Sequence, residues 1–166
     1  MRATRIVLAF VVLAMAVSCG PGKATDRMKE LIQAIDEGDG QLAASMLSQS
    51  ALGKLSESLD RFKRDPGAAS QQLTAIGVQI TAEELQTITP RAFARKLVSS
   101  QATAEIMRAA RPEVTHVSVD GDTAMVEIEA TLQNTKQTMV IRLVVEDGEW
   151  RVTSLPINPV KIHFGF

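Results

Sequence analysis

The sequence predicts an α+β fold in which N-terminal helices pack on a curved antiparallel β-sheet. Over residues 25–111, apolar residues recur at spacings of three and four, the period of amphipathic helices. Over residues 113–155, they alternate with polar residues, the period of strands that bury one face. Because the period changes once, helices precede strands instead of alternating with them. Residues 25–166 are therefore predicted to form a single domain.

The first three predicted helices are recognised by their apolar faces. Asp26 can cap the first helix and Gly38 can end it. A second helical stretch begins at Asp39, and a third is broken by the Asp-Pro-Gly sequence at residues 65–67. The residues expected to face inward are Met28, Leu31, Ile32 and Ile35 in the first, Leu42, Met46 and Leu47 in the second, and Leu52, Leu55, Leu59 and Phe62 in the third.

Capping signals predict the remaining helices. Asp65 and Pro66 supply a cap and a first-turn proline for a helix that runs to Ile76. Thr81 and Glu84 form a capping box for a short helix. One longer helix is then predicted over residues 89–111, which begin with a Thr-Pro pair and are followed by a proline.

The sheet is predicted from two Asp-Gly hairpin signals, at residues 120–121 and 147–148. The first turn would place Val117 opposite Ala124, and the second would place Val145 opposite Trp150. Both registers put apolar residues on one face, which comprises Ala124, Val126, Ile128, Ala130, Leu132, Met139, Ile141, Leu143, Val145, Trp150 and Val152. The C-terminal segment 156–166 alternates again and is expected to form a last strand or to pack over the sheet.

The opposite face of the predicted sheet mixes charged with apolar residues. These residues are Glu127, Glu129, Val140, Arg142, Val144, Arg151 and Leu155. One interpretation is a solvated face with cross-strand charge pairs. The other is a partner surface, which would allow a homodimer through this outer face of the sheet.

Residues 1–18 are predicted to be a signal peptide. Two arginines precede the apolar run 6–17, which as a helix would rise about 18 Å, against about 30 Å for the hydrocarbon core of a bilayer. Ala16 and Ser18 suit ordinary signal peptidase. Residues 16–19 also resemble the bacterial lipobox. That resemblance implies cleavage before Cys19 and lipid on its thiol, and residues 19–24 would then be the lipidated cysteine and a short tether.

The expected location follows from this N-terminus. In a Gram-negative source it is the inner leaflet of the outer membrane, facing the periplasm, and otherwise it is the cell surface. The lipid would make the membrane a partner of the protein.

The composition excludes several classes of function. A formal net charge of −1 without a basic patch predicts no nucleic-acid partner. The chain has no tyrosine and two histidines, which leaves few residues for acid–base chemistry. His116 and His163 do not have the spacing of metal ligands, so no metal or other cofactor is expected.

Three stretches resemble the nuclear transport factor 2-like superfamily, whose fold is a cystatin-like cone. They are "IQAIDEGDGQLAASMLS", "VSVDGDTAMVEIEA" and "MVIRLVVEDGEWRVTSL". Within that superfamily, the pattern is most similar to small bacterial lipoproteins of unknown function. Its enzymes, such as ketosteroid isomerase and scytalone dehydratase, place Asp, His or Tyr inside the cone. The inward positions here are apolar, so none of those catalytic residues is transferred to this chain.

These observations predict a lipid-anchored protein of the cell envelope that acts as a non-catalytic binding or interaction module, with an envelope protein as partner. The alternative is a carrier of an apolar small molecule in a cone lined by Val126, Ile128, Ile141, Leu143 and Trp150. A weaker alternative is an isomerase- or hydrolase-like enzyme. That enzyme would need a carboxylate such as Asp60 or Glu105 to point into the cone.

Overall fold

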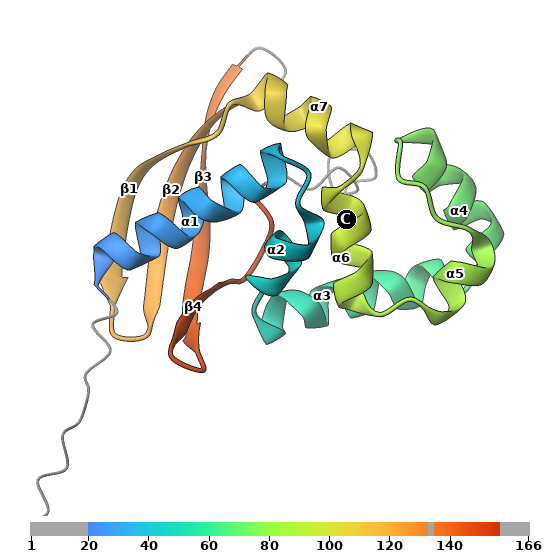
Figure 1. Ribbon diagram of the computed structural model, residues 1–166, viewed down its shortest axis with the longest axis horizontal. Helices are drawn as coiled ribbons and strands as arrows, with labels where there is room; N and C mark the ends of the chain where they lie inside the picture. The colour runs from blue at the N-terminus through green and yellow to red at the C-terminus, as the bar shows by residue number, and fades with distance from the viewer. Residues whose placement is uncertain (1–19, 133–134, 157–166) are drawn as a thin grey trace, which may run out of the picture.

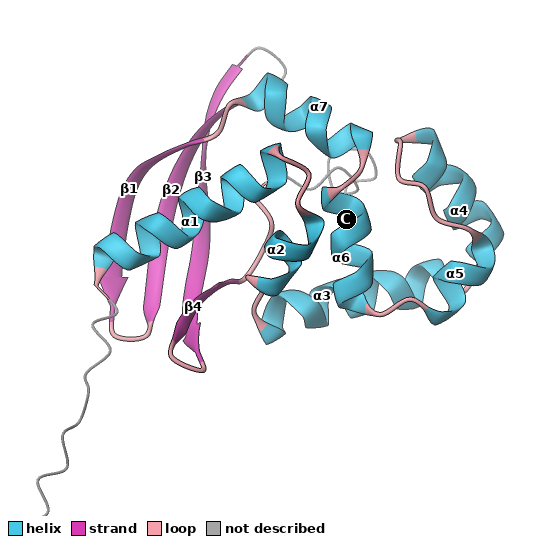
Figure 2. Cartoon of the chain, in the orientation of Figure 1, coloured by secondary structure: helices cyan, strands magenta, loops and turns pink. Residues whose placement is uncertain are grey.

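The computed structural model of the chain describes residues 20–132 and 135–156, in which helices precede strands (Figures 1 and 2). The helices are α1 (Pro21–Asp36), α2 (Gly40–Ser45), α3 (Gln49–Phe62), α4 (Pro66–Ala75), α5 (Ala82–Thr87), α6 (Pro90–Val98) and α7 (Gln101–Ala110). The strands are β1 (Glu113–Asp120), β2 (Thr123–Leu132), β3 (Thr135–Glu146) and β4 (Glu149–Val152). This order confirms the predicted α+β class.

The four strands form one antiparallel sheet in the order β1-β2-β3-β4. Val145 lies opposite Trp150, as the Asp147-Gly148 turn predicts. The predicted register of the first hairpin is wrong, because Val117 lies opposite Val126 instead of Ala124. The turn there is residues 121–122, and its glycine takes the positive φ of 54° that the first position of a type II′ turn requires. A shift of two residues keeps each side chain on its predicted face.

Helix α1 begins earlier than predicted. Gly20 is its N-cap, Pro21 occupies its first turn, and no side chain caps it, so Asp26 lies inside the helix instead of at its start. Proline fits the first helical turn because its missing N–H would have no partner there. Most of the predicted tether is therefore helical, and Ala24 is fully buried in the core.

The single long helix predicted over residues 89–111 is wrong, because α6 and α7 are separate. Ser100 is the N-cap of α7: its hydroxyl accepts the N–H of Thr103 at 3.3 Å and donates to the carbonyl of Leu97 at 2.7 Å. Thr103 also donates its hydroxyl to Leu97, at 2.6 Å. These buried side chains satisfy backbone groups that a continuous helix would have paired, which is how serine breaks helices.

The predicted N-caps of α4, α5 and α6 are confirmed. Asp65, Thr81 and Thr89 each accept the backbone N–H three residues later, at the starts of α4, α5 and α6. Glu84, the other member of the predicted capping box, instead pairs its carboxylate with Lys96 at 2.9 Å.

One predicted inward residue is exposed. Leu42 is 37% exposed, whereas Met46 and Leu47 of the same stretch are buried. Helix α2 ends at Ser45, so these last two residues do not share its helical period.

Two large apolar clusters hold the fold together. The first lies between the inner face of the sheet and helices α1 and α7, and it includes Met28, Leu31, Val126 and Ile128. The second belongs to helices α3 to α6. In Figure 1, α3, α4 and α5 extend away from the sheet as a helical lobe. The sheet and this lobe thus have separate cores, which α2 and α6 connect.

Several predictions concern residues outside the described part of the chain. These are the signal peptide with Cys19, and the C-terminal segment from residue 157 onward with His163. Among the described residues, no helix combines the length and the apolar character needed to cross a membrane.

Candidate ligand-binding groove

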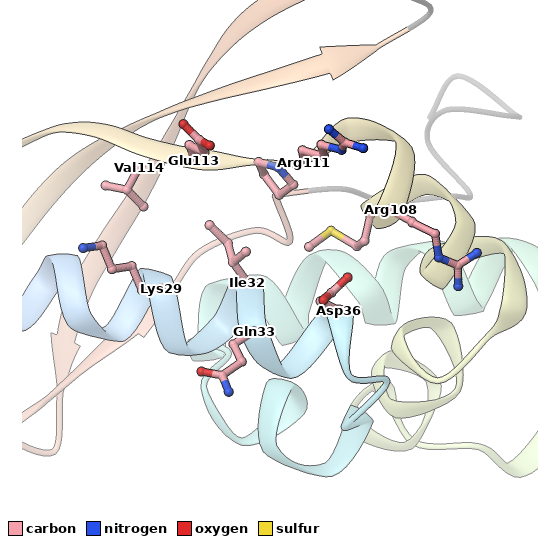
Figure 3. A pocket seen from close by; sticks show the side chains of 10 residues that line it. Lys29, Ile32, Gln33, Asp36, Arg108, Arg111, Glu113 and Val114 are labelled. Carbon is pink, nitrogen blue, oxygen red and sulfur yellow. The ribbon is translucent and has the colours of Figure 1, made fainter.

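A groove of about 690 Å³ opens between α1, α7 and the start of β1 (Figure 3). Its lining residues are Lys29, Ile32, Gln33 and Asp36 from α1, Met107 and Arg108 from α7, Arg111 and Pro112 from the connection, and Glu113 and Val114 from β1. The volume lies within the range of about 300–1,000 Å³ that is usual for small-molecule sites.

The floor of the groove is apolar and consists of Ile32, Met107 and Val114. Helix α1 buries Met28 and Ile35 against the sheet, which leaves Ile32 at the side of that face and only partly buried. Met107 is buried, and Val114 is partly buried at the start of β1. Both Ile32 and Met107 line the groove, and Figure 3 shows Ile32 pointing into its middle. The floor is thus the uncovered margin of the main core.

The rim of the groove is charged. In the described part of the chain, the side chains of Lys29, Asp36, Arg108 and Arg111 are exposed and form no hydrogen bond or ion pair. Gln33 differs, because its amide donates to Glu37 at 2.7 Å. The four unpaired charges can therefore contact a ligand without first breaking a bond within the protein.

Arg111 has an unusual backbone conformation. It follows α7 with φ 45° and ψ 60°, in the left-handed region, and its N–H bonds to the carbonyl of Met107 at 2.9 Å. Glycine is the usual residue at this position of a helix C-terminus, because a side chain costs about 1–2 kcal/mol in the left-handed region. Pro112 cannot continue the helix. The chain thus keeps an arginine at the groove where glycine would be less strained.

The five residues predicted to line a pocket in the cone lie together on the inner face of the sheet. Val126, Ile128 and Leu143 have no exposed surface, because they pack in the cluster that contains α1. Ile141 is also buried there. A side chain that borders open space keeps accessible surface, so the interior is filled at the level of these residues.

Trp150, the fifth of these residues, borders a smaller cavity of about 280 Å³ near the start of α1. Arg27 crosses this region and pairs with Glu30 at 3.0 Å and with Glu149 at 3.4 Å. The indole N–H of Trp150 is buried and has no partner in the described residues. Three of the charged residues that line this cavity, Arg27, Glu30 and Glu149, are thus already paired with one another.

A third cavity, of about 400 Å³, lies between α4, α5 and α6. Its cation, Lys96, pairs with Glu84 at 2.9 Å and donates to the carbonyl of Gln79 at 3.1 Å. Ser70 donates to the carbonyl of Ile80 at 2.6 Å. Because these polar groups already have partners, this cavity is a weaker candidate than the groove.

The candidate acids and the histidine of the sheet region are exposed. Asp60 and Glu105 are at the surface, and Glu105 accepts a hydrogen bond from Gln101 at 2.8 Å. His116 is exposed on β1, opposite Glu127. Within the described ranges, no three His, Cys, Asp or Glu side chains form a cluster that could hold a metal ion.

The outer face of the sheet carries Met125 and Val140, which are 41% and 52% exposed. Lys136 pairs with Glu129 there, and the hydrogen bond to Glu129 and its negative charge raise the pKa of Lys136.

Leu155 was expected on this face, but it packs against the inner clusters, since the chain leaves β4 at Val152 and turns inward. Arg151 reaches around the sheet to the carbonyl of Ser45 and also pairs with Glu149.

Sequence reasoning missed the groove because three separate segments build it. The Arg-Pro pair at residues 111–112 was recognised as a helix end, and a non-glycine residue at such an end was the available signal. The convergence of α1, α7 and β1 depends on how the helices cross the sheet.

The sequence profile of one protein family, described as "Putative lumazine-binding", matches residues 68–155 of the chain. This range runs from α4 to just beyond β4, and it includes the groove residues of α7 and β1 but not those of α1. The match fits the resemblance to the nuclear transport factor 2-like superfamily. None of the curated proteins compared with the chain matches it.

Proposed function

The chain belongs to this lumazine-binding family, whose fold is the nuclear transport factor 2-like cone. We propose that its domain binds a small molecule reversibly and without catalysis, in the groove between α1, α7 and β1. A planar heteroaromatic ring of the lumazine type is the expected class of ligand. The family supports small-molecule binding, and the geometry of the groove supports the place.

The observation that carries this proposal is the combination of an apolar floor with an unpaired polar rim. A ring can lie on Ile32, Met107 and Val114, while its carbonyl and ring nitrogen atoms reach the charged groups at the edge. The interior of the cone is less suited, because Val126, Ile128 and Leu143 have no exposed surface. The groove is therefore preferred to the interior for a carrier or sensor of small molecules.

The proposal is tested by calorimetric titration of residues 20–166 with lumazine. Ile32→Glu should abolish binding, because it places a charge on the floor, and Ile32→Ala should weaken binding without a new charge. Leu42→Glu is the matched control, since it makes the same change on an exposed residue outside the groove. The proposal fails if the wild-type protein does not bind lumazine, or if Ile32→Glu and Leu42→Glu bind it equally well.

We further propose that lipid on Cys19 anchors this domain to a membrane of the cell envelope. The lipobox-like residues 16–19 support this, and α1 starts at Pro21, two residues after Cys19. Two residues span at most about 7 Å, so the first turn of α1 would lie close to the bilayer. Mass spectrometry and membrane fractionation of the wild type and Cys19→Ala test the anchor. If both are recovered as the same unmodified soluble species, the anchor is excluded.

A further inference from the structure

We infer that the ligand of the groove carries an anionic group, such as a carboxylate or phosphate, which binds to Arg108 and Arg111 at the α7 end. This inference rests on the proposed function and specifies the chemistry of its ligand. Figure 3 shows these two arginines at one end of the groove and Lys29 at the other, with Ile32 between them. A ring on the floor would thus direct a substituent toward either end.

The two arginines are available for an anion. Neither side chain has a hydrogen bond or an ion pair among the described residues, so neither must leave a partner. A guanidinium group presents its N–H donors in a plane that matches the two oxygens of a carboxylate or phosphate. An acidic substituent is therefore the complement of this end of the groove.

The backbone at Arg111 supports a role for its side chain. The left-handed conformation with φ 45° favours glycine, yet the chain has an arginine there, on the rim of the groove. Strained residues of this kind concentrate at binding sites, where the rest of the fold holds them in place. At this position arginine supplies a guanidinium group beside the floor of the groove, whereas glycine would be unstrained but would supply no side chain.

Two other features of this end bear on the inference. Asp36 and Glu113 also line the groove and would repel an anion. With Lys29, Arg108 and Arg111, the charges of the lining residues sum to about +1. Arg108 also lies in the last turn of α7, where a cation interacts favourably with the helix dipole. If the arginines served only to stabilise α7, the groove would show no preference for an anionic ligand.

Lumazine and lumazine-6-carboxylate form a matched pair of probes, because they share the ring and differ by one carboxylate. Titration at neutral pH and low salt should show the carboxylate binding about tenfold more tightly to the wild-type protein, with the difference shrinking as salt is added. Arg111→Ala should remove this difference. Arg64→Ala, which removes an exposed arginine outside the groove, should retain it. Asp36→Asn should enlarge it, since it removes the repulsion.

The outcomes separate this inference from the proposed function. Equal binding of both probes overturns the inference and leaves lumazine binding intact. Binding of neither probe overturns the proposed function as well. If Arg111→Ala lowers the melting temperature but leaves the ratio of the two affinities unchanged, the arginine serves α7 and the inference is wrong. Acetate or inorganic phosphate that competes as strongly as the lumazine carboxylate would show a simple anion site without a ring, which also overturns it.

Discussion

The carboxylate of Glu146, at the end of β3, accepts the backbone N–H of Gln49, the first residue of α3, at 3.0 and 3.2 Å from its two oxygens. The N-cap Ser48 beside it accepts the N–H of Ala51 at 3.1 Å and donates its own N–H to the carbonyl of Val152 at 3.0 Å. Glu146, a residue of the sheet, thus completes the N-terminal cap of α3, the first helix of the helical lobe. This contact joins segments 97 residues apart.

We expect Glu146→Ala to destabilise the fold by about 1 kcal/mol, because it removes a charged acceptor from a helix N-terminus. Glu57→Ala is the control, since Glu57 is exposed within the same helix. Urea unfolding of both variants measures the difference. Equal free energies of unfolding would mean that the Glu146 contact contributes nothing to stability.

The close approach of α2 and α6 depends on Gly40. A Cβ atom there would lie 2.3 Å from the carbonyl oxygen of Arg95 and 2.6 Å from the hydroxyl of Ser99. Gly40→Ala should therefore cost about 2 kcal/mol, as other overpacked positions do. Gly53→Ala, in α3 with open space around it, should instead stabilise the protein by up to about 1 kcal/mol. Thermal unfolding should give melting temperatures that shift in opposite directions, and a parallel shift would contradict this.

Replacing Arg111 with glycine should stabilise the protein by about 0.5–1 kcal/mol, because the relief of left-handed strain exceeds the entropy that glycine adds to the unfolded chain. The same variant should lose the preference for a carboxylated ligand. Asp147→Gly is the control, at a φ of 53° in a turn that tolerates aspartate, and it should change stability less. A destabilised Arg111→Gly protein in chemical denaturation would show that the arginine is not strained.

The Lys136–Glu129 pair on the outer face of the sheet has a testable pH dependence. The hydrogen bond to Glu129 and its charge raise the pKa of Lys136, so any stabilisation is present below the ordinary lysine pKa and is lost as the pH rises through the higher value. Both side chains are exposed, so the effect on stability is small. An NMR titration should show the pKa of Lys136 falling in Glu129→Gln. An unchanged pKa would show that the pair does not persist in solution.

Local signals in the sequence predicted much of the fold. The caps at Asp65, Thr81 and Thr89 and the Asp147-Gly148 turn depend on residues a few positions apart, so the sequence contains all of the relevant contacts. The alternation in the strands predicted their inner face even where the register of the first hairpin was wrong, because a two-residue shift preserves the face. The division at Ser100 was missed, since the apolar period continues across it while its buried hydrogen bonds break the helix.

By itself, the sequence determined the α+β class, the apolar face of the sheet and most helix ends, because these follow from periodicity and short-range hydrogen bonds. Only the tertiary structure decided where a ligand could be held. The predicted interior residues are buried in the main core, to which α1 contributes, while Ile32, Met107 and Val114 meet at its margin beneath unpaired charges. The crossing of helices over a sheet depends on many packed side chains at once, and no single segment of the sequence encodes it.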